Sequence, residues 1–347
     1  MQKPRKIEGA DTLEHIGTQT LRLNTAVCVA AGAAVVGKKE GDGPLGTRFD
    51  TVSTDSYFGQ KSWEAAETVM LRQCFDTVCR KSGVVPQYIL AGDLQNQCTA
   101  SAYAVRDVGV PYLGLYNACS TMGEALSLGA VLTECGAVSV CAMTSSHFCS
   151  AERQFRGPLE YGGQRTPTAQ WTVTGAGAVI LKNDGSTPGP CITHVTTGKV
   201  VDAGVKDLAD MGAAMAPAAL DTLLAHFNDT GRTPDYYDAI VTGDLGWFGH
   251  AILEDLAQQE NLKLGAAREF TDCGMLMFDR ERQDVHAGGS GAGCSAAVFA
   301  GHILKNMQDG VWNRVLFAPT GALMSTVTSQ QGESIPAICH AVAVENP

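Results

Sequence analysis

The stretch 117–126 contains the residues of this chain that are best placed to do chemistry. It follows an apolar segment, 112–116, that is typical of a strand, and it presents Cys119 at a turn of small residues where a helix begins. Ser120 and Thr121 are good N-cap residues, and Glu124 has the spacing of a capping-box acid. The positive end of a helix dipole favours thiolate. The stretch therefore predicts a nucleophilic cysteine, with a buried structural cysteine as the alternative.

The chain repeats this arrangement, which predicts two related halves. Cys294 precedes a second predicted helix, as Cys119 precedes the first. Thr144 follows the strand after Cys119, and Thr320 follows the strand after Cys294 at nearly the same spacing. Alternating strands and crossover helices predict an α/β fold in which each half has a mostly parallel sheet. The Gly/Pro-rich segment 184–190 reads as the linker between the halves.

The predicted halves are residues 1–185, which carry Cys119, and residues 191–347, which carry Asp244 and Ser290. An apolar content of 45% in 347 residues predicts a large buried core. The net charge of −11 argues against a nucleic-acid partner, which would need a basic face. No apolar run approaches the ~20 residues of a spanning helix, and no signal peptide is predicted.

The 12 cysteines of the chain are scattered and form no C-x-x-C pair. This spacing predicts neither a zinc site nor a redox site, and no metal site is expected. It also predicts no disulfide framework. A chain of this size with so many unpaired cysteines is typical of a reducing, intracellular setting.

The duplicated unit with a cysteine at a strand-to-helix turn resembles the thiolase superfamily of thiolases, ketoacyl synthases and other condensing enzymes. The resemblance covers nearly the whole chain and rests on the motifs at 117–120, 174–179 and 288–295. It implies a thiolase-like fold with α-β-α-β-α layers. It also implies a cysteine that takes the acyl group, with histidine or asparagine partners from the second half.

The second half departs from that pattern at both partner positions. Asp244 stands where the first histidine would follow the strand, and Ser290 stands where the second partner would lie. An aspartate repels a developing oxyanion, and a serine is a weak replacement for imidazole. His250 and His286 are displaced and are interpreted as structural. The degenerate set with Cys119 therefore predicts a non-enzymatic binding protein. The alternative is an acyl-CoA or acyl-carrier-dependent condensing enzyme with Cys119 as nucleophile.

Longer motifs in both halves resemble the stage V sporulation protein AD family. These motifs lie at 41–46, 91–97, 144–147, 151–156, 160–164, 210–219, 288–295 and 333–336. The resemblance implies a component that binds dipicolinic acid, with calcium, for uptake into the developing spore. It implies peripheral association with the spore inner membrane, on the forespore cytoplasmic side, through integral membrane partners of the same system.

Dipicolinate is a flat dianion, so its site needs planar or backbone donors, a helix N-terminus and an apolar face. The candidate ligand-binding residues are Cys119, Ser120, Ser145, Ser146, His147, Arg153, Arg156, Gln95 and Asn96. The alternative for the arginines is a solvated or Glu152-paired loop, and for 145–147 it is a capped strand end. No cofactor is expected other than calcium carried with the ligand, because no calcium loop is present. A homodimer is left open, since thiolases usually dimerise.

Overall fold

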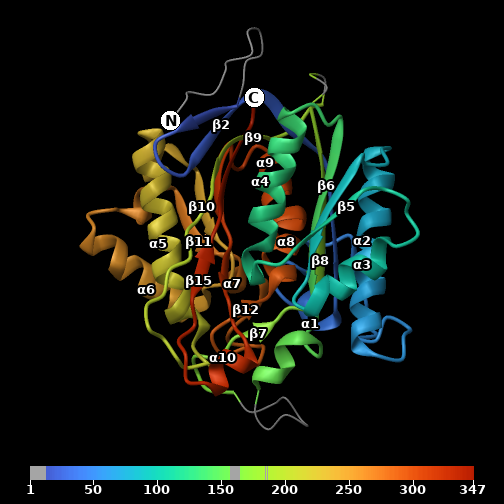
Figure 1. Cartoon of the computed structure of the whole chain (residues 1–347), viewed down its shortest axis with the longest axis vertical. Helices are drawn as coiled ribbons and strands as arrows, with labels where there is room; N and C mark the ends of the chain where they lie inside the picture. Colours follow the sequence, from blue (N-terminus) through green and yellow to red (C-terminus); the bar gives the residue numbers. More distant parts are fainter. Residues whose placement is uncertain (1–12, 157–164, 184, 186) are drawn as a thin grey trace, which may run out of the picture.

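The computed structural model describes residues 13–156, 165–183, 185 and 187–347. These residues form a mixed α/β structure of stacked layers (Figure 1). The motif at 160–164 lies outside the described residues. Among the described residues, no helix combines the length and the apolar character that crossing a bilayer requires.

One twelve-stranded sheet runs through the described part of the chain, in the order β11-β10-β13-β16-β9-β2-β8-β6-β4-β5 with β1 and β3 attached to β2. Read outward from its centre, the sheet has the same strand order in both halves. The first half contributes β2 (Thr20–Val36), β8 (Gly175–Lys182), β6 (Ser139–Ser146), β4 (Tyr88–Gly92) and β5 (Tyr112–Leu115). The second half contributes β9 (Cys191–Thr196), β16 (Ala341–Glu345), β13 (Arg314–Ala318), β10 (Ala239–Thr242) and β11 (Glu269–Asp272).

The sheet is mixed, but four of the five strands in each half run in the same direction, which confirms the expectation of mostly parallel halves. The outer three strands of each half run parallel, whereas β8 runs antiparallel to both β6 and β2. β8 runs antiparallel to β6 because the connection between them returns at the same end of the sheet, where Ser146 at the end of β6 lies opposite Gly175 at the start of β8. No α-helix crosses back over the sheet in the described part of this connection, so the chain returns in the opposite direction.

Helices cover the sheet in three layers (Figure 1). The helices α2 (Trp63–Ser82) and α3 (Thr99–Val105) cover the outer face of the first half, and α5 (Met211–Thr230) and α6 (Gly246–Gln259) cover that of the second. Between the halves lie α4 (Thr121–Glu134) and α8 (Ala292–Val298), which continues through the π-helix η7 (Phe299–Ile303) into α9 (Leu304–Gln308).

Three hydrophobic clusters fill the interfaces between these layers. Leu126 and Val298 belong to the central cluster, Leu223 to the cluster under α5 and α6, and Met70 to the cluster under α2. This arrangement confirms the predicted α-β-α-β-α layers. The division at 185–191 stays a prediction, since β2 and β9 pair directly and make the two halves one sheet.

The remaining elements are short. They are β1 (Glu14–Ile16), α1 (Lys38–Gly41), η1 (Gly46–Arg48), β3 (Thr51–Val52), η2 (Asn96–Cys98), η3 (Ala118–Ser120), η4 (Ala151–Phe155), β7 (Trp171–Thr172), η5 (Pro234–Tyr236), η6 (Leu264–Ala266), α7 (Cys273–Met277), β12 (Gly289–Ser290), β14 (Thr320–Ala322), α10 (Thr326–Gln330) and β15 (Ala337–Cys339). Two of them, η3 and η4, position the candidate site.

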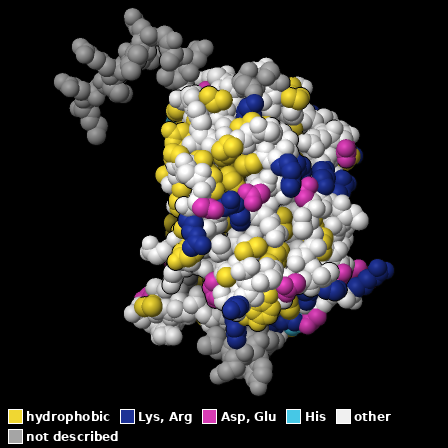
Figure 2. Space-filling view, turned by 90° about the vertical axis from the view of Figure 1, so that its right-hand side faces the viewer, with side chains coloured by type: hydrophobic (Ala, Val, Ile, Leu, Met, Phe, Trp, Pro, Cys, Tyr) yellow, Lys and Arg dark blue, Asp and Glu magenta, His cyan; other side chains and the backbone are white. Residues whose placement is uncertain are grey.

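The strand β5 forms one end of the sheet, and its outer edge has no partner strand among the described residues. Leu113 on this strand and Tyr103 on α3 are exposed. The face that carries α2 and α3 shows apolar patches between charged side chains (Figure 2). The homodimer stays a prediction.

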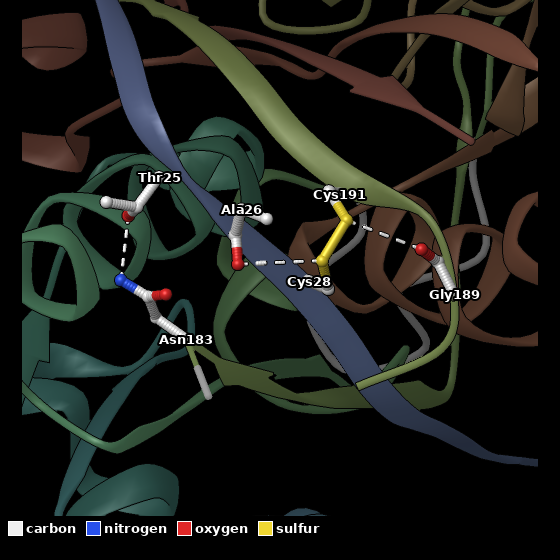
Figure 3. Close-up of a disulfide and its surroundings, with 6 residues drawn as sticks. All are labelled: Thr25, Ala26, Cys28, Asn183, Gly189 and Cys191. Atoms are coloured by element: carbon white, nitrogen blue, oxygen red, sulfur yellow. Dashed lines mark hydrogen bonds between the residues drawn. A yellow bond between two sulfur atoms is a disulfide. The ribbon is translucent and has the colours of Figure 1, made fainter. Parts of the chain in front are cut away.

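A disulfide joins Cys28 on β2 to Cys191 on β9 (Figure 3). The two residues are opposite each other in the antiparallel register of these strands, so the bond links the two halves. The expectation that the cysteines are all unpaired was therefore wrong for this pair. The partners are 163 residues apart, and spacing alone does not reveal such a pairing.

Candidate functional site

Cys119 lies at the turn between β5 and α4, as the sequence predicts, and its side chain is buried. The preceding residue, Ala118, has a φ of 49° in the left-handed region, which non-glycine residues rarely adopt. The predicted capping box is absent, because the Ser120 side chain makes no cap hydrogen bond to α4 and Thr121 Oγ1 donates to the carbonyl of Ala118 at 2.6 Å. Ser120 Oγ instead donates to the carbonyl of Pro319 at 2.7 Å and accepts from the backbone N–H of His340 at 3.1 Å. Ser120 therefore ties the cysteine turn to the second half of the chain.

The structure brings Cys119, Asp244 and Ser290 into one cluster, although they are far apart in the sequence. Asp244 follows β10 and makes a side-chain contact with Cys119. Gly291 N–H donates to Asp244 Oδ2 at 3.2 Å. Glu152 on η4 links the other two residues, since its Oε1 lies 3.8 Å from Cys119 Sγ and its Oε2 accepts from Ser290 Oγ at 3.5 Å. Asp244 and Ser290, the residues at the two positions predicted for partners of the cysteine, are thus both near Cys119, together with a carboxylate from the first half.

Burial and acidic neighbours keep the Cys119 thiol protonated. Burial, Asp244 and Glu152 raise its pKa well above the usual range of a thiol. Burial also raises the pKa of Asp244 to about 8, so this carboxyl is mostly neutral at pH 7. The prediction that the helix dipole favours thiolate was wrong, because the penalty of burying a charged thiolate beside acidic groups outweighs a dipole effect of about 1 kcal/mol.

Arg156 has its donors occupied by protein groups. Its Nη1 donates to the carbonyl of Phe148 at 2.7 Å, and its Nη2 donates to Thr172 Oγ1 and lies 3.7 Å from Glu152 Oε2. The guanidinium also stacks over the Phe148 ring at 4.1 Å. Arg153 is half-buried on the same turn η4. The alternative of a Glu152-paired loop therefore describes Arg156 well.

Gln95 and Ser145 point to a buried carboxylate rather than to the cysteine. Gln95 Nε2 donates to Glu67 Oε2 at 2.9 Å, and Ser145 Oγ donates to Glu67 Oε1 at 3.0 Å. Asp93 accepts hydrogen bonds from the backbone N–H groups of Gln95 and Ser101, as a structural turn acid does. These polar groups at the ends of β4 and β6 form an internal network.

The remaining candidates also have other partners or face solvent. Ser146 Oγ donates to the carbonyl of Val173 at 2.7 Å, which agrees with the capped-strand alternative. His147 Nε2 donates to the carbonyl of Ser56 at 2.9 Å, and burial lowers its pKa. His147 lines a separate cavity of about 510 Å³. Asn96 is exposed at the start of η2.

A cavity of about 280 Å³ opens beside Cys119. Its walls come from the cysteine turn, from η4, from the start of α5 and from the segment after β14. The lining residues are Leu94, Tyr116, Ala118, Cys119, Ala151, Glu152, Gln154, Phe155, Met211, Ala322, Leu323 and Met324. The cavity thus has mainly apolar walls and a polar floor formed by the thiol and a carboxylate.

A smaller compartment of about 50 Å³ shares several of these walls, including Glu152 and Phe155. It adds Arg156, Arg165 and Gln170. The carbonyl oxygen Oε1 of Gln170 is buried without a hydrogen-bond partner. Both guanidinium groups have carboxylate partners, since Arg165 pairs with Asp284 and Arg156 lies beside Glu152, so the compartment is lined by paired charges and one unpaired amide oxygen.

Sequence reasoning missed several residues of the site. Glu67 gives no local signal, because it lies in a regular amphipathic helix, and Gln170 stands in an irregular segment. His340 has its Nε2 3.1 Å from Asn117 Nδ2, and burial lowers its pKa to about 4. Thr320 was recognised only as the repeat counterpart of Thr144. Its position after the second-half strand could have indicated that its hydroxyl reaches Asp244.

Comparison with known proteins identifies relatives over nearly the full length. The sequence pattern of the family described as Stage V sporulation protein AD (SpoVAD) matches residues 17–345. Stage V sporulation protein AD of Bacillus subtilis (strain 168) is 43% identical over 334 residues, which cover 95% of this chain and 97% of that protein.

Solved structures of condensing enzymes share the fold. The 3-oxoacyl-[acyl-carrier-protein] synthase III of Aquifex aeolicus VF5 superimposes with a TM-score of 0.55 at 12% identity, over 92% of this chain and 100% of that one. The tetronic acid condensing enzyme AbyA1 gives a TM-score of 0.57 at 17% identity, over 92% and 100%. A point variant of OleA from Xanthomonas campestris gives a TM-score of 0.56 at 12% identity, over 93% and 99%. At these identities the likeness establishes the thiolase-like fold alone.

Proposed function

The chain belongs to the stage V sporulation protein AD family, and from this premise we propose that it binds dipicolinic acid, or its calcium complex, for loading into the developing spore. In this proposal the condensing-enzyme scaffold serves as a binding protein. The cavity at Cys119 is the ligand site.

The observation that carries the proposal is the replacement of imidazole by a carboxyl at the cysteine. Asp244 contacts Cys119, whereas the hydrogen bonds that histidine side chains make in the described part of the chain go to groups other than the Cys119 thiol. A thiol with a raised pKa, beside carboxyl groups and without an adjacent imidazole, is poorly prepared for nucleophilic attack. A site that has this chemistry and an open cavity supports binding better than acyl transfer.

The cavity at Cys119 and the smaller compartment beside it suit a small flat acid. Phe155, Met211 and Met324 supply apolar walls for a ring. In the small compartment, a ligand carboxylate would compete with Glu152 and Asp284 for the guanidinium groups of Arg156 and Arg165. Glu152 opposes a free dianion at the boundary between the cavity and the compartment. Calcium bound to dipicolinate would offset that repulsion, because the metal cancels the ligand's charge.

A second candidate function is a condensing enzyme or acyltransferase that uses Cys119. The fold and the strained turn at Ala118 favour it, since left-handed non-glycine residues cluster at functional turns. In that case Glu152 or Asp244 would have to act as the base. The elevated pKa of Asp244, about 8, is in the range of a general acid or base.

Peripheral attachment to the spore inner membrane through integral membrane partners of the uptake system belongs to the same proposal. It rests on the family resemblance. Co-purification from forespore membranes, tested before and after a high-salt wash, would examine it.

Calorimetric titration tests the binding function. We expect saturable binding of dipicolinate, with and without calcium, and weaker binding of benzene-1,3-dicarboxylate, which keeps both carboxylates but lacks the ring nitrogen. Absence of binding at millimolar dipicolinate would refute the proposal. Intact-mass analysis after incubation with acyl-CoA donors decides the rival function. Acylation that disappears in Cys119→Ala would establish the enzyme.

A further inference from the structure

Glu67 on α2 is a fully buried carboxylate that connects three separate segments. Its Oε1 accepts from Ser145 Oγ at the end of β6, at 3.0 Å. Its Oε2 accepts from Gln95 Nε2 after β4, at 2.9 Å, and from Ser150 Oγ at 2.7 Å. All three donors are neutral side chains, so the carboxylate is held by hydrogen bonds and has no cationic partner among them.

Two of these segments are next to a wall of the cavity at Cys119. Gln95 follows Leu94, and Ser150 precedes Ala151 and Glu152, and these three neighbours line the cavity. Ser150 is also the N-cap residue of η4, and its side chain makes no cap hydrogen bond to that turn. The carboxylate of Glu67 is thus an attachment point for the turn that carries Glu152.

We propose that Glu67 is a positioning residue that holds η4, and with it Glu152, against the ligand cavity, and that protonation of its carboxyl loosens this wall. The consequence for ligand binding rests on the proposed function; the consequence for the wall does not. An ionised carboxylate accepts from all three donors at once. A protonated carboxyl must turn one of its oxygens into a donor and so gives up an acceptor position.

The charge of Glu67 is sensitive to pH near neutrality. Burial and the adjacent Asp93 raise its pKa to about 7, against the effect of its three hydrogen bonds. Asp93 faces it from the end of β4 and is itself held by Ser101. On the β6 side His147 donates to the carbonyl of Ser56, and on α2 Glu64 is exposed. Of these groups, Asp93 is the one that acts on the Glu67 carboxyl.

Hydrogen–deuterium exchange of the chain without added ligand tests the wall directly. With exchange corrected for intrinsic rates, we expect the protection of segment 148–156 to fall about tenfold between about pH 8 and about pH 6. Glu67→Gln mimics the protonated acid and should show the low protection at both pH values. Glu64→Gln is the matched control, since it makes the same change on an exposed face of the same helix, and it should behave like the wild type.

The effect of Glu67 on ligand binding is measured in a separate experiment. At about pH 8, Glu67→Gln should weaken dipicolinate binding about tenfold, with Glu64→Gln unchanged. If the wild type binds no dipicolinate, the proposed function fails while the exchange experiment still decides the role of Glu67. Should Glu67→Gln fail to fold, Ser150→Ala removes one of the three bonds and should lower the protection of the same segment. Protection that is independent of pH and equal in all folded variants would overturn the proposal.

Discussion

Thr320 Oγ1 donates a hydrogen bond of 2.8 Å to Asp244 Oδ1, across 76 residues of sequence. Together with the N–H of Gly291 on the other oxygen, this bond fixes the carboxyl that faces Cys119. The repeat counterpart Thr144 donates instead to the carbonyl of Ala292 at 2.7 Å. The duplicated threonines therefore have different roles, and the second-half copy serves the site.

Thr320→Val should destabilise the fold by about 1–3 kcal/mol, because a buried carboxyl oxygen loses its donor while the side-chain volume is kept. Chemical denaturation at pH 7 measures the change. Thr54→Val, on an exposed side chain, is the control and should stay within about 0.5 kcal/mol. Equal stability of both variants would mean that the bond to Asp244 contributes little.

We expect the ionisation of Asp244 to lower the free energy of unfolding as the pH rises. Its pKa is raised from an ordinary value near 4 to about 8, so the folded state holds the proton more tightly than the unfolded chain does. Its contribution is complete below pH ~4 and is lost as the pH rises through about 8, with a slope of at most ~1.4 kcal/mol per pH unit.

Asp244→Asn should remove this part of the slope, whereas Asp255→Asn on the exposed side of α6 should leave it. Unfolding free energies measured between pH 5 and pH ~8.5 give the comparison. A wild-type profile that matches that of Asp244→Asn would contradict a buried carboxyl of raised pKa.

Cys119 should react slowly with iodoacetamide at neutral pH. Burial and two carboxyls raise the pKa of its thiol, whereas Cys135 is an exposed thiol in the same chain. Peptide mapping of the alkylated protein should show labelling of Cys119 at least about tenfold slower than that of Cys135. Faster labelling of Cys119 would instead indicate an activated nucleophile and would favour the condensing-enzyme function.

The Cys28–Cys191 bond should stabilise the chain by about 2–4 kcal/mol, because it closes a long loop between the two halves. Digestion under non-reducing conditions should yield the linked peptides. Cys28→Ser should lower the free energy of unfolding, and reductant should then have no further effect. Cys135→Ser is the control; a wild type that is insensitive to reductant would show that the bond contributes nothing.

Local patterns in the sequence predict much of the fold and part of the site. The strand, turn and helix around Cys119 follow from hydrophobic spacing and small residues. The duplication is readable because Cys119 and Cys294 precede equivalent helices. The replacement of imidazole by Asp244 and Ser290 is visible as soon as the repeat is aligned with the superfamily pattern. These are features of short range or of fixed period, which a single sequence displays.

The chemistry of those positions depends on contacts that form only in the folded chain. The Cys119 thiol stays protonated because it is buried and because Asp244 and Glu152 reach it from distant segments, whereas the sequence indicates Glu152 only as a partner for the arginines. Gln95 and Ser145 proved to serve Glu67, and Cys28 proved to pair with Cys191. The physical reason is common to these cases. Burial and long-range neighbours determine protonation and hydrogen bonding, and neither is written in the spacing of residues along the chain.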